Sequence, residues 1–150
     1  MRNQGLDHSI GFRLAIASRR FTQMFLMRIK DYDLTPEQWS VLYRIRDRDG
    51  MIQKEIADRA GKDKPTTTRI LDLLEEKGYI TKRSGESDRR SYHVYITESG
   101  RRVAEAIAPI EHQTDLDATE VLTEEEYLQL MDMLERVSNH AALWIENGKV

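Results

Sequence analysis

Residues 62–90 include two groups of side chains whose types and spacing suit contacts with nucleic acid. Lysine ammonium groups and threonine hydroxyls bind phosphate oxygens, and an arginine guanidinium pairs with a guanine edge or enters a narrow minor groove. A helix that can enter a groove beside a basic ribbon is typical of DNA recognition. We therefore predict that eight residues contact DNA: Lys62, Lys64, Thr66, Thr68, Arg69, Asp88, Arg89 and Arg90.

The second group lies in the charged stretch GESDRRS, residues 85–91, which is rich in turn-forming residues and predicts a hairpin tip. Arg90 is assigned to the minor groove, whose negative potential attracts a guanidinium. Asp88 is expected to hold Arg90 by a charge-assisted hydrogen bond, and Arg89 is assigned to a phosphate. The alternative is a solvent-exposed ion pair with no part in binding.

The first group belongs to a helix predicted over residues 64–77, with Asp63 as its N-cap and Pro65 in its first turn. Successive residues are about 100° apart around a helix, so apolar positions can be assigned to one side. The residues expected to face the core are Thr67, Ile70, Leu71 and Leu74. Thr67 is thus assigned a structural role.

The outward side of this helix holds the candidates for reading DNA. Arg69 is expected to pair with a guanine, and its alternatives are a phosphate contact or an ion pair with Asp72 in the same helix. Thr66 and Thr68 are expected to donate to phosphate or to touch a thymine methyl group. The two lysines nearby are assigned to phosphates, where they supply affinity.

Catalytic and metal-binding chemistry is not indicated. The chain has no cysteine, which excludes disulfides, thiol redox sensing and cysteine-bound zinc. Its four histidines show no pair at i, i+4, and no glycine-rich phosphate loop or nucleophile–base motif is present. We expect neither an enzyme nor a bound metal or cofactor.

The elements that position these residues form a mainly α-helical chain with a small β-hairpin, an α+β fold. Helices are predicted over 8–30, 35–48, 53–60 and 64–77, and strands over 79–84 and 92–97. A further helix opens after Thr97-Glu98, where Pro109 should kink or interrupt it, and the last begins at a capping box on Thr123. Helix, helix, helix and hairpin is the winged helix-turn-helix order.

The first and last helices have apolar surface beyond what one core-facing stripe needs. Large apolar residues spread widely around residues 8–30, and a near-heptad stripe runs from Tyr127 to Trp144. An oligomer interface would cover the first helix, and burial in the centre of a monomer is the alternative. The stripe on the last helix predicts a packing seam.

Charge is distributed unevenly. The net charge is −3, but residues 1–49 hold 9 basic and 6 acidic side chains, residues 50–102 hold 12 and 9, and residues 103–150 hold 2 and 11. This distribution is expected for a chain whose first two thirds bind an anionic partner, and the alternative is a well-solvated surface with an accidental asymmetry of charge. There is no apolar run of about 20 residues and no secretion signal, so we expect no membrane association and a cytoplasmic location.

Three stretches resemble the MarR family of bacterial transcriptional regulators. They are LTPEQWSVLYRI (residues 34–45), QKEIADRAGKDKPTTTRILDLLEEKGYI (53–80) and DRRSYHVYITESG (88–100). The last is similar to the wing pattern of that family through Asp88, Arg90, Ile96 and Thr97. Ile52 departs from the pattern, because the family often has a capping threonine there.

The resemblance implies a homodimer that binds a pseudo-palindromic operator in double-stranded DNA, and in most cases a repressor released by a small aromatic ligand. It implies dimerisation helices at 1–34 and 98–150 around a DNA-binding lobe at 35–97. On family analogy, Phe12, Ile16, Trp39 and Tyr43 are ligand-binding candidates. For the Met- and Phe-rich residues 21–29, a core role is the alternative to a pocket.

One other class of function stays open at this point. A winged-helix protein–protein interaction module without DNA binding would share the fold. The basic turn and the outward Thr68 and Arg69 argue against it, since a protein-binding wing would show exposed apolar residues instead.

Overall fold

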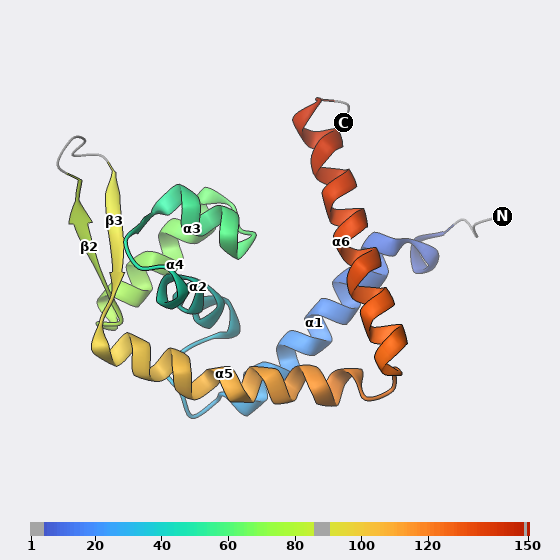
Figure 1. The fold of residues 1–150 in the computed structure, drawn as a ribbon, viewed down its shortest axis with the longest axis horizontal. Helices are drawn as coiled ribbons and strands as arrows, with labels where there is room; N and C mark the ends of the chain where they lie inside the picture. The colour runs from blue at the N-terminus through green and yellow to red at the C-terminus, as the bar shows by residue number, and fades with distance from the viewer. Residues whose placement is uncertain (1–4, 86–90, 149) are drawn as a thin grey trace. The chain divides into compact units, whose positions relative to one another are not determined.

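The computed structural model describes residues 5–85, 91–148 and 150 (Figure 1). The predicted order of four helices, a hairpin and two helices is confirmed, in a mainly α fold with a small sheet. The elements are η1 (Leu6–His8), α1 (Ile10–Arg28), α2 (Pro36–Asp47), β1 (Met51–Ile52), α3 (Gln53–Ala60), α4 (Lys64–Glu76), β2 (Ile80–Ser84), β3 (Tyr92–Ile96), α5 (Glu98–Thr119) and α6 (Glu124–Glu146).

The chain divides into two compact units, Met1–Thr114 and Asp115–Val150. The first holds η1, α1 to α4, the sheet and most of α5, and it contains the hydrophobic core. The second holds the end of α5 and all of α6, in which no residue is buried. The functional division into residues 1–34, 35–97 and 98–150 stays a prediction.

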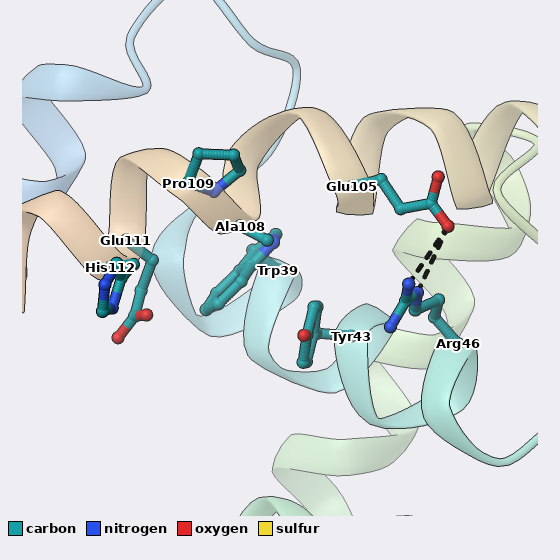
Figure 2. A pocket seen from close by; sticks show the side chains of 8 residues that line it. All are labelled: Trp39, Tyr43, Arg46, Glu105, Ala108, Pro109, Glu111 and His112. Atoms are coloured by element: carbon teal, nitrogen blue, oxygen red, sulfur yellow. Dashed lines mark hydrogen bonds and ion pairs between the residues drawn. The ribbon is translucent and has the colours of Figure 1, made fainter.

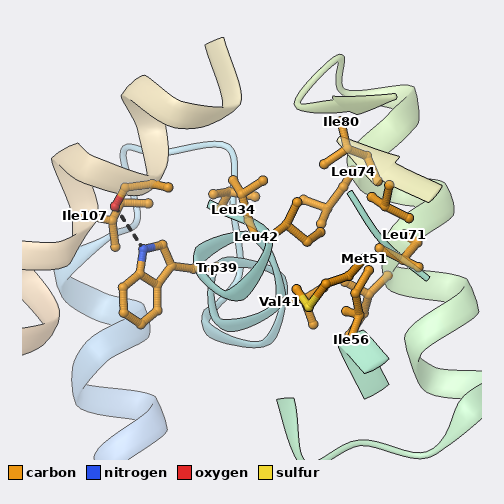
Figure 3. Close-up of a cluster of buried hydrophobic side chains, with 14 of the residues drawn as sticks. Leu34, Trp39, Val41, Leu42, Met51, Ile56, Leu71, Leu74, Ile80 and Ile107 are labelled. Atoms are coloured by element: carbon orange, nitrogen blue, oxygen red, sulfur yellow. Dashed lines mark hydrogen bonds between the residues drawn. The ribbon is translucent and has the colours of Figure 1, made fainter. Parts of the chain in front are cut away.

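The core of the first unit forms around α2. Val41, Leu42 and Ile45 are completely buried on one side of this helix. They pack with residues of α3, α4, the sheet and α5, including Ile56, Leu71, Leu74, Ile80 and Ile107 (Figure 3). Burying an apolar side chain of this size contributes about 1.5–3 kcal/mol, so the core fixes α4 relative to α2 and the sheet.

Local signals in the sequence set the helix ends. The capping box at the start of α2 is present, because the Thr35 hydroxyl accepts from the Gln38 backbone N–H and the Gln38 side chain accepts from the Thr35 N–H, both at 3.2 Å. The capping box of Thr123 and Glu126 opens α6 in the same way. Both predicted capping boxes are confirmed.

The sheet contains one strand that the sequence analysis missed. Its order is β1-β3-β2, with β3 antiparallel to both neighbours. β1 is only two residues long, and Met51 pairs with Val94. A two-residue strand has no alternation to detect, so only its pairing with β3 defines it.

Pro109 does not interrupt α5, which is continuous from Glu98 to Thr119, so the prediction of an interruption is wrong. A proline lacks the N–H that would bond the carbonyl one turn earlier. Pro109 itself is exposed, while Ile107 is fully buried and Ile110 packs against the core. Packing on both sides of the proline therefore keeps the helix continuous.

Gly100 is required by a close approach of the chain. A Cβ at this position would lie 2.1 Å from the carbonyl oxygen of Tyr79. The approach is fixed because the Thr97 N–H donates to that same oxygen at 3.0 Å, and the Thr97 hydroxyl donates to the Gly78 carbonyl at 2.7 Å. The start of α5 is thereby clamped to the turn that precedes β2.

We expect Gly100→Ala to destabilise the protein by about 1–3 kcal/mol, because the added methyl group forces the start of α5 away from the Tyr79 carbonyl. Urea denaturation at equilibrium measures the change. A suitable control is Ala106→Ser, at an exposed position of the same helix. Gly148→Ala would not serve as a control, because Gly148 has a φ of 60°, which a residue with a Cβ rarely adopts. Equal stability of the Gly100→Ala variant and the parent protein would contradict the prediction.

Candidate nucleic-acid interface

Helices α3 and α4 are joined by a short turn that sets the direction of α4. Gly61 ends α3 in the left-handed conformation, with a φ of 63°, and its N–H donates to the Ala57 and Asp58 carbonyls. Lys62 and Asp63 follow, and α4 begins at Lys64. A left-handed residue at this place lets the chain turn sharply without the steric cost of a Cβ. The pair is a helix-turn-helix.

The predicted N-cap of α4 is confirmed. The Asp63 carboxylate accepts from the Thr66 backbone N–H at 2.8 Å, and Pro65 lies in the first turn. The hydrogen bond from the Thr66 N–H favours the charged form and lowers the pKa of Asp63 below its ordinary value of 3.8. The α3 helix lacks such a cap, because Ile52 occupies its N-cap position without a side-chain hydrogen bond.

We expect the Asp63 carboxylate to stabilise the fold at neutral pH. Its folded-state pKa is lowered, so the stabilisation is complete above the unfolded value of about 3.8 and is lost as the pH falls through the folded value. Asp63→Ala should lower the Tm at pH 7. Asp63→Asn keeps an acceptor but no charge, so its Tm deficit relative to the parent protein should shrink below about pH 4. Thermal unfolding between pH 2.5 and 7 measures both effects, and a deficit independent of pH would contradict the charge argument.

The inward and outward sides of α4 are as predicted. Thr67, Ile70, Leu71 and Leu74 are buried, and the Thr67 hydroxyl donates to the Asp63 carbonyl at 2.8 Å. Lys64, Thr68 and Arg69 are exposed, whereas Thr66 and Lys62 are half-buried. The outward side thus presents cations and a hydroxyl-bearing residue to solvent. Their contacts with DNA stay predictions.

Arg69 has an ion-pair partner that the sequence did not indicate. Its guanidinium lies 3.6 Å from the carboxylate of Glu37, at the start of α2, and both side chains are more than half exposed. The alternative pair within α4 is not formed, because Asp72 pairs with Lys82 of β2 at 2.5 Å. An exposed pair such as Arg69–Glu37 contributes about 0–1 kcal/mol, so Arg69 can leave Glu37 at little cost.

The hairpin follows the antiparallel register from Ile80–Ile96 to Ser84–Tyr92. Beyond it, the Gly85 N–H donates to the Ser91 carbonyl at 3.1 Å. Asp88, Arg89 and Arg90 lie outside the residues that the structure describes, so their assignment rests on the sequence.

One further cation on the hairpin was not among the predicted residues. Arg83 of β2 is exposed, and its guanidinium lies 4.5 Å from the centre of the Tyr95 ring. A cation–π contact of this kind holds the side chain in place. The alternation of β2 was a signal for its exposure, because Ile80 and Lys82 occupy the other face.

Trp39 and Tyr43 lie together in an open cavity of about 620 Å³ between α2 and α5 (Figure 2). Their ring centres are 5.1 Å apart, and the Trp39 indole N–H donates to the Ala104 carbonyl at 3.2 Å. The other lining residues are Arg46, Glu105, Ala108, Pro109, Glu111 and His112. Phe12 and Ile16, half-buried on α1, are not among them. The structure therefore brings two of the four ligand candidates together.

Charged groups close one end of this cavity. The Arg46 guanidinium lies 3.3 Å from the Glu105 carboxylate and 5.5 Å from the centre of the Tyr43 ring. The hydrogen bond from Arg46 to Glu105 raises the pKa of the guanidinium, so Arg46 stays charged. The cavity offers aromatic faces beside a cation and an anion.

Two other kinds of feature are absent from the described ranges 5–85, 91–148 and 150. Within them, no group of three or more histidine, aspartate or glutamate side chains is placed to hold a metal ion. No helix there is both long and apolar enough to cross a membrane.

The fold and this surface define a winged helix-turn-helix protein: an α3–α4 pair with an exposed second helix, followed by a two-stranded wing. The sequence model of the MarR family matches residues 34–92. The HTH-type transcriptional regulator SarZ of Staphylococcus aureus is 29% identical over 108 residues, which are 72% of this chain and 73% of SarZ.

Solved structures extend the likeness beyond the matched segment. A MarR protein from Peptoclostridium difficile has a TM-score of 0.87 at 26% identity, covering 97% of this chain and 96% of that protein. MepR of S. aureus in complex with DNA has a TM-score of 0.81 at 25% identity, covering 88% and 98%. The chain is thus similar to MarR-family proteins in its residues 34–92 and shares their fold. It is a DNA-binding transcriptional regulator and not an enzyme.

Proposed function

We propose that this regulator acts as a homodimer that binds a pseudo-palindromic operator in double-stranded DNA and represses transcription until a small aromatic effector releases it. Each copy inserts α4 into the major groove and the wing into the adjacent minor groove. The observation that carries the proposal is the outward side of α4, which presents Lys64, Thr68 and Arg69 from a helix anchored by four buried residues. A DNA partner also accords with a cytoplasmic location.

The roles of the predicted residues follow from their chemistry. Lys62 and Lys64 bind phosphates at the start of α4, where the helix dipole also favours anions. Arg69 pairs with a guanine, and Thr66 and Thr68 contact the floor of the major groove. Arg90, supported by Asp88, enters the minor groove while Arg89 meets a phosphate. The assignments of Asp88, Arg89 and Arg90 rest on the wing pattern in the sequence.

Dimerisation is supported by the exposed apolar surface of the terminal helices. In the first unit, Ile10 and Leu14 of α1 are exposed, and in the second unit α6 exposes Met131, Val137 and Trp144. A lone helix with no buried residue gains little stability from its own sequence, so tertiary packing is needed to hold it. A second copy of the chain supplies that packing and gives the two-fold symmetry that a palindromic site requires. Residues 1–34 and 98–150 are therefore assigned to the dimer and 35–97 to DNA.

The effector site is assigned to the cavity between α2 and α5. A flat aromatic ring would stack against Tyr43 and Trp39, and an acidic substituent would pair with Arg46. Helix α2 lines this cavity and also contacts α4, because Glu37 at the start of α2 pairs with Arg69 of α4. Release of bound DNA by small phenolic and aromatic compounds, lost in the Tyr43→Ala variant, would support the assignment. No release by any of them would contradict it.

Binding of the protein to its own upstream DNA, compared with a scrambled duplex of equal length over a salt series, tests the main proposal. We expect selective binding with a palindromic footprint. Arg90→Ala should reduce the affinity about tenfold and lower the slope of log K against log[salt] by about 1 for each half-site. The absence of binding to any duplex at low salt would contradict DNA recognition and favour an interaction module.

A further inference from the structure

Two of the three consecutive threonines at the start of α4, Thr67 and Thr68, have hydroxyl groups that are occupied within the protein. The Thr67 hydroxyl donates to the Asp63 carbonyl at 2.8 Å. The Thr68 hydroxyl donates to the Lys64 carbonyl, one turn earlier in α4, at 2.9 Å. A hydroxyl has one proton to donate, so neither of these groups is free to donate to DNA without breaking an existing bond.

Thr68 is also held from a second helix. The side-chain amide of Gln53, the first residue of α3, donates to the Thr68 hydroxyl and also to the Lys64 carbonyl, the latter at 3.5 Å. The Thr68 hydroxyl therefore both donates a hydrogen bond to the protein and accepts one from it. Thr68 is nevertheless exposed. The part of this side chain that remains for a partner is its methyl group.

We propose that Thr68 reads a thymine by contact between its methyl group and the C5-methyl of the base, and that Gln53 is the positioning residue that keeps the Thr68 hydroxyl turned away from the DNA. The inference rests on the proposed insertion of α4 into the major groove. It selects the thymine contact from the two roles that the sequence predicted for Thr68, and it adds a residue, Gln53, that was not among the predicted contacts.

The chemistry of the major groove supports this assignment. Thymine is the only base that presents a methyl group there, and apolar side-chain atoms are its natural partners. A hydroxyl facing the groove would instead tolerate several bases, because it both donates and accepts. Because the Thr68 hydroxyl is held by the Lys64 carbonyl and Gln53, only the Thr68 methyl group faces the base, and the side chain selects thymine instead of tolerating several bases.

The test uses duplexes that the protein itself selects from random sequence. In the consensus duplex, each thymine is replaced in turn by deoxyuridine, which differs only in lacking the methyl group. For the parent protein we expect one thymine in each half-site at which this replacement weakens binding about fourfold, the effect of one buried methyl group.

Two matched variants separate the two parts of the Thr68 side chain. Thr68→Val keeps a methyl group and the β-branch but removes the hydroxyl, so it should retain the fourfold preference for thymine. Thr68→Ser keeps the hydroxyl and removes the methyl group, so it should bind thymine and uracil duplexes equally. Serine and valine have similar helix propensities, which limits effects on α4 itself.

Gln53→Met tests the positioning role. It should reduce the preference for thymine when Thr68 is present but not in combination with Thr68→Val, because valine presents a methyl group whichever way it turns. If Gln53→Met lowered the preference for thymine equally with Thr68 and with Thr68→Val, the role of Gln53 would be merely structural and its assignment would be overturned.

The outcomes distinguish this inference from the proposal beneath it. Selective binding with no thymine sensitive to deoxyuridine, or a preference kept by Thr68→Ser and lost by Thr68→Val, overturns the methyl contact alone. Failure of the parent protein to select any duplex at low salt overturns the proposed function and this inference together.

Discussion

Substituting glutamate for both Leu130 and Val137 on α6 is expected to convert the protein to monomers and to reduce operator affinity by more than 100-fold. The two residues are exposed in a single copy and lie one heptad apart in the predicted packing stripe. Two carboxylates brought into an apolar interface between copies would be desolvated without partners, which costs several kcal/mol.

The size of the expected effect on DNA binding comes from the loss of bivalency. When two DNA-binding lobes are linked, the second half-site is engaged as an intramolecular event, and the affinity gain is about 10²–10⁴. A monomer would keep its contacts to one half-site and lose this gain. Sedimentation velocity measures the mass, and a binding titration on the same samples measures the affinity.

A control pair places the same two charges on another side of α6. Gln129→Glu with Asn139→Glu changes two exposed polar residues; at about 100° per residue, Asn139 lies roughly opposite Leu130 and Val137, and Gln129 lies about a quarter turn away from them. This variant should remain dimeric and bind the operator as the parent protein does. If both double variants were dimers with full affinity, the interface would not involve this stripe.

Arg69→Ala is expected to weaken binding to the selected operator by about 5- to 150-fold, which corresponds to roughly 1–3 kcal/mol, and to relax the base preference at one position of each half-site. The reason is the loss of a bidentate contact to guanine. Arg69 is available for this contact because its partner Glu37 holds it only in an exposed ion pair.

Arg69→Lys distinguishes base reading from a phosphate contact. Lysine keeps the charge but not the planar pair of donors, so base preference should fall while the salt dependence of binding stays nearly unchanged. Sequence selection from random duplexes, together with a salt series, gives both quantities. If the Arg69→Lys variant kept the parent preference, the guanidinium would be binding phosphate and not a base.

Glu37→Gln offers a check on the resting position of Arg69. Without the Glu37 carboxylate, the Arg69 guanidinium loses its ion-pair partner in α2, so its positive charge is more available to the DNA. We expect a modest gain in affinity at low salt that disappears as salt rises. A loss of base preference in this variant would instead show that Glu37 aims Arg69 at its base.

Much of the recognition unit was predictable from the sequence because its signals are local. The caps at Thr35, Asp63 and Thr123 need only a side chain and a backbone N–H three residues away. The orientation of α4, with Thr67 inward and Arg69 outward, follows from the helical repeat once the apolar residues are assigned to the core. The resemblance in the same stretches pointed to the MarR family, whose sequence model matches residues 34–92.

What the tertiary structure decided concerns residues far apart in the chain. Strand β1 exists because Met51 pairs with Val94 of β3. Helix α5 continues past Pro109 because Ile107 and Ile110 pack against the core. The partners of Arg69 and Thr68 lie on α2 and α3, at separations where no periodicity connects them.

By itself, the sequence determined which residues of α4 face outward, because the helical repeat and the caps act within one or two turns. Only the tertiary structure decided how those residues are held, and that the Trp39–Tyr43 pair lies beside Arg46 and Glu105 and apart from Phe12 and Ile16. The physical reason is that side-chain hydrogen bonds, ion pairs and cavities depend on distances between elements, which are set by the packing of the whole core.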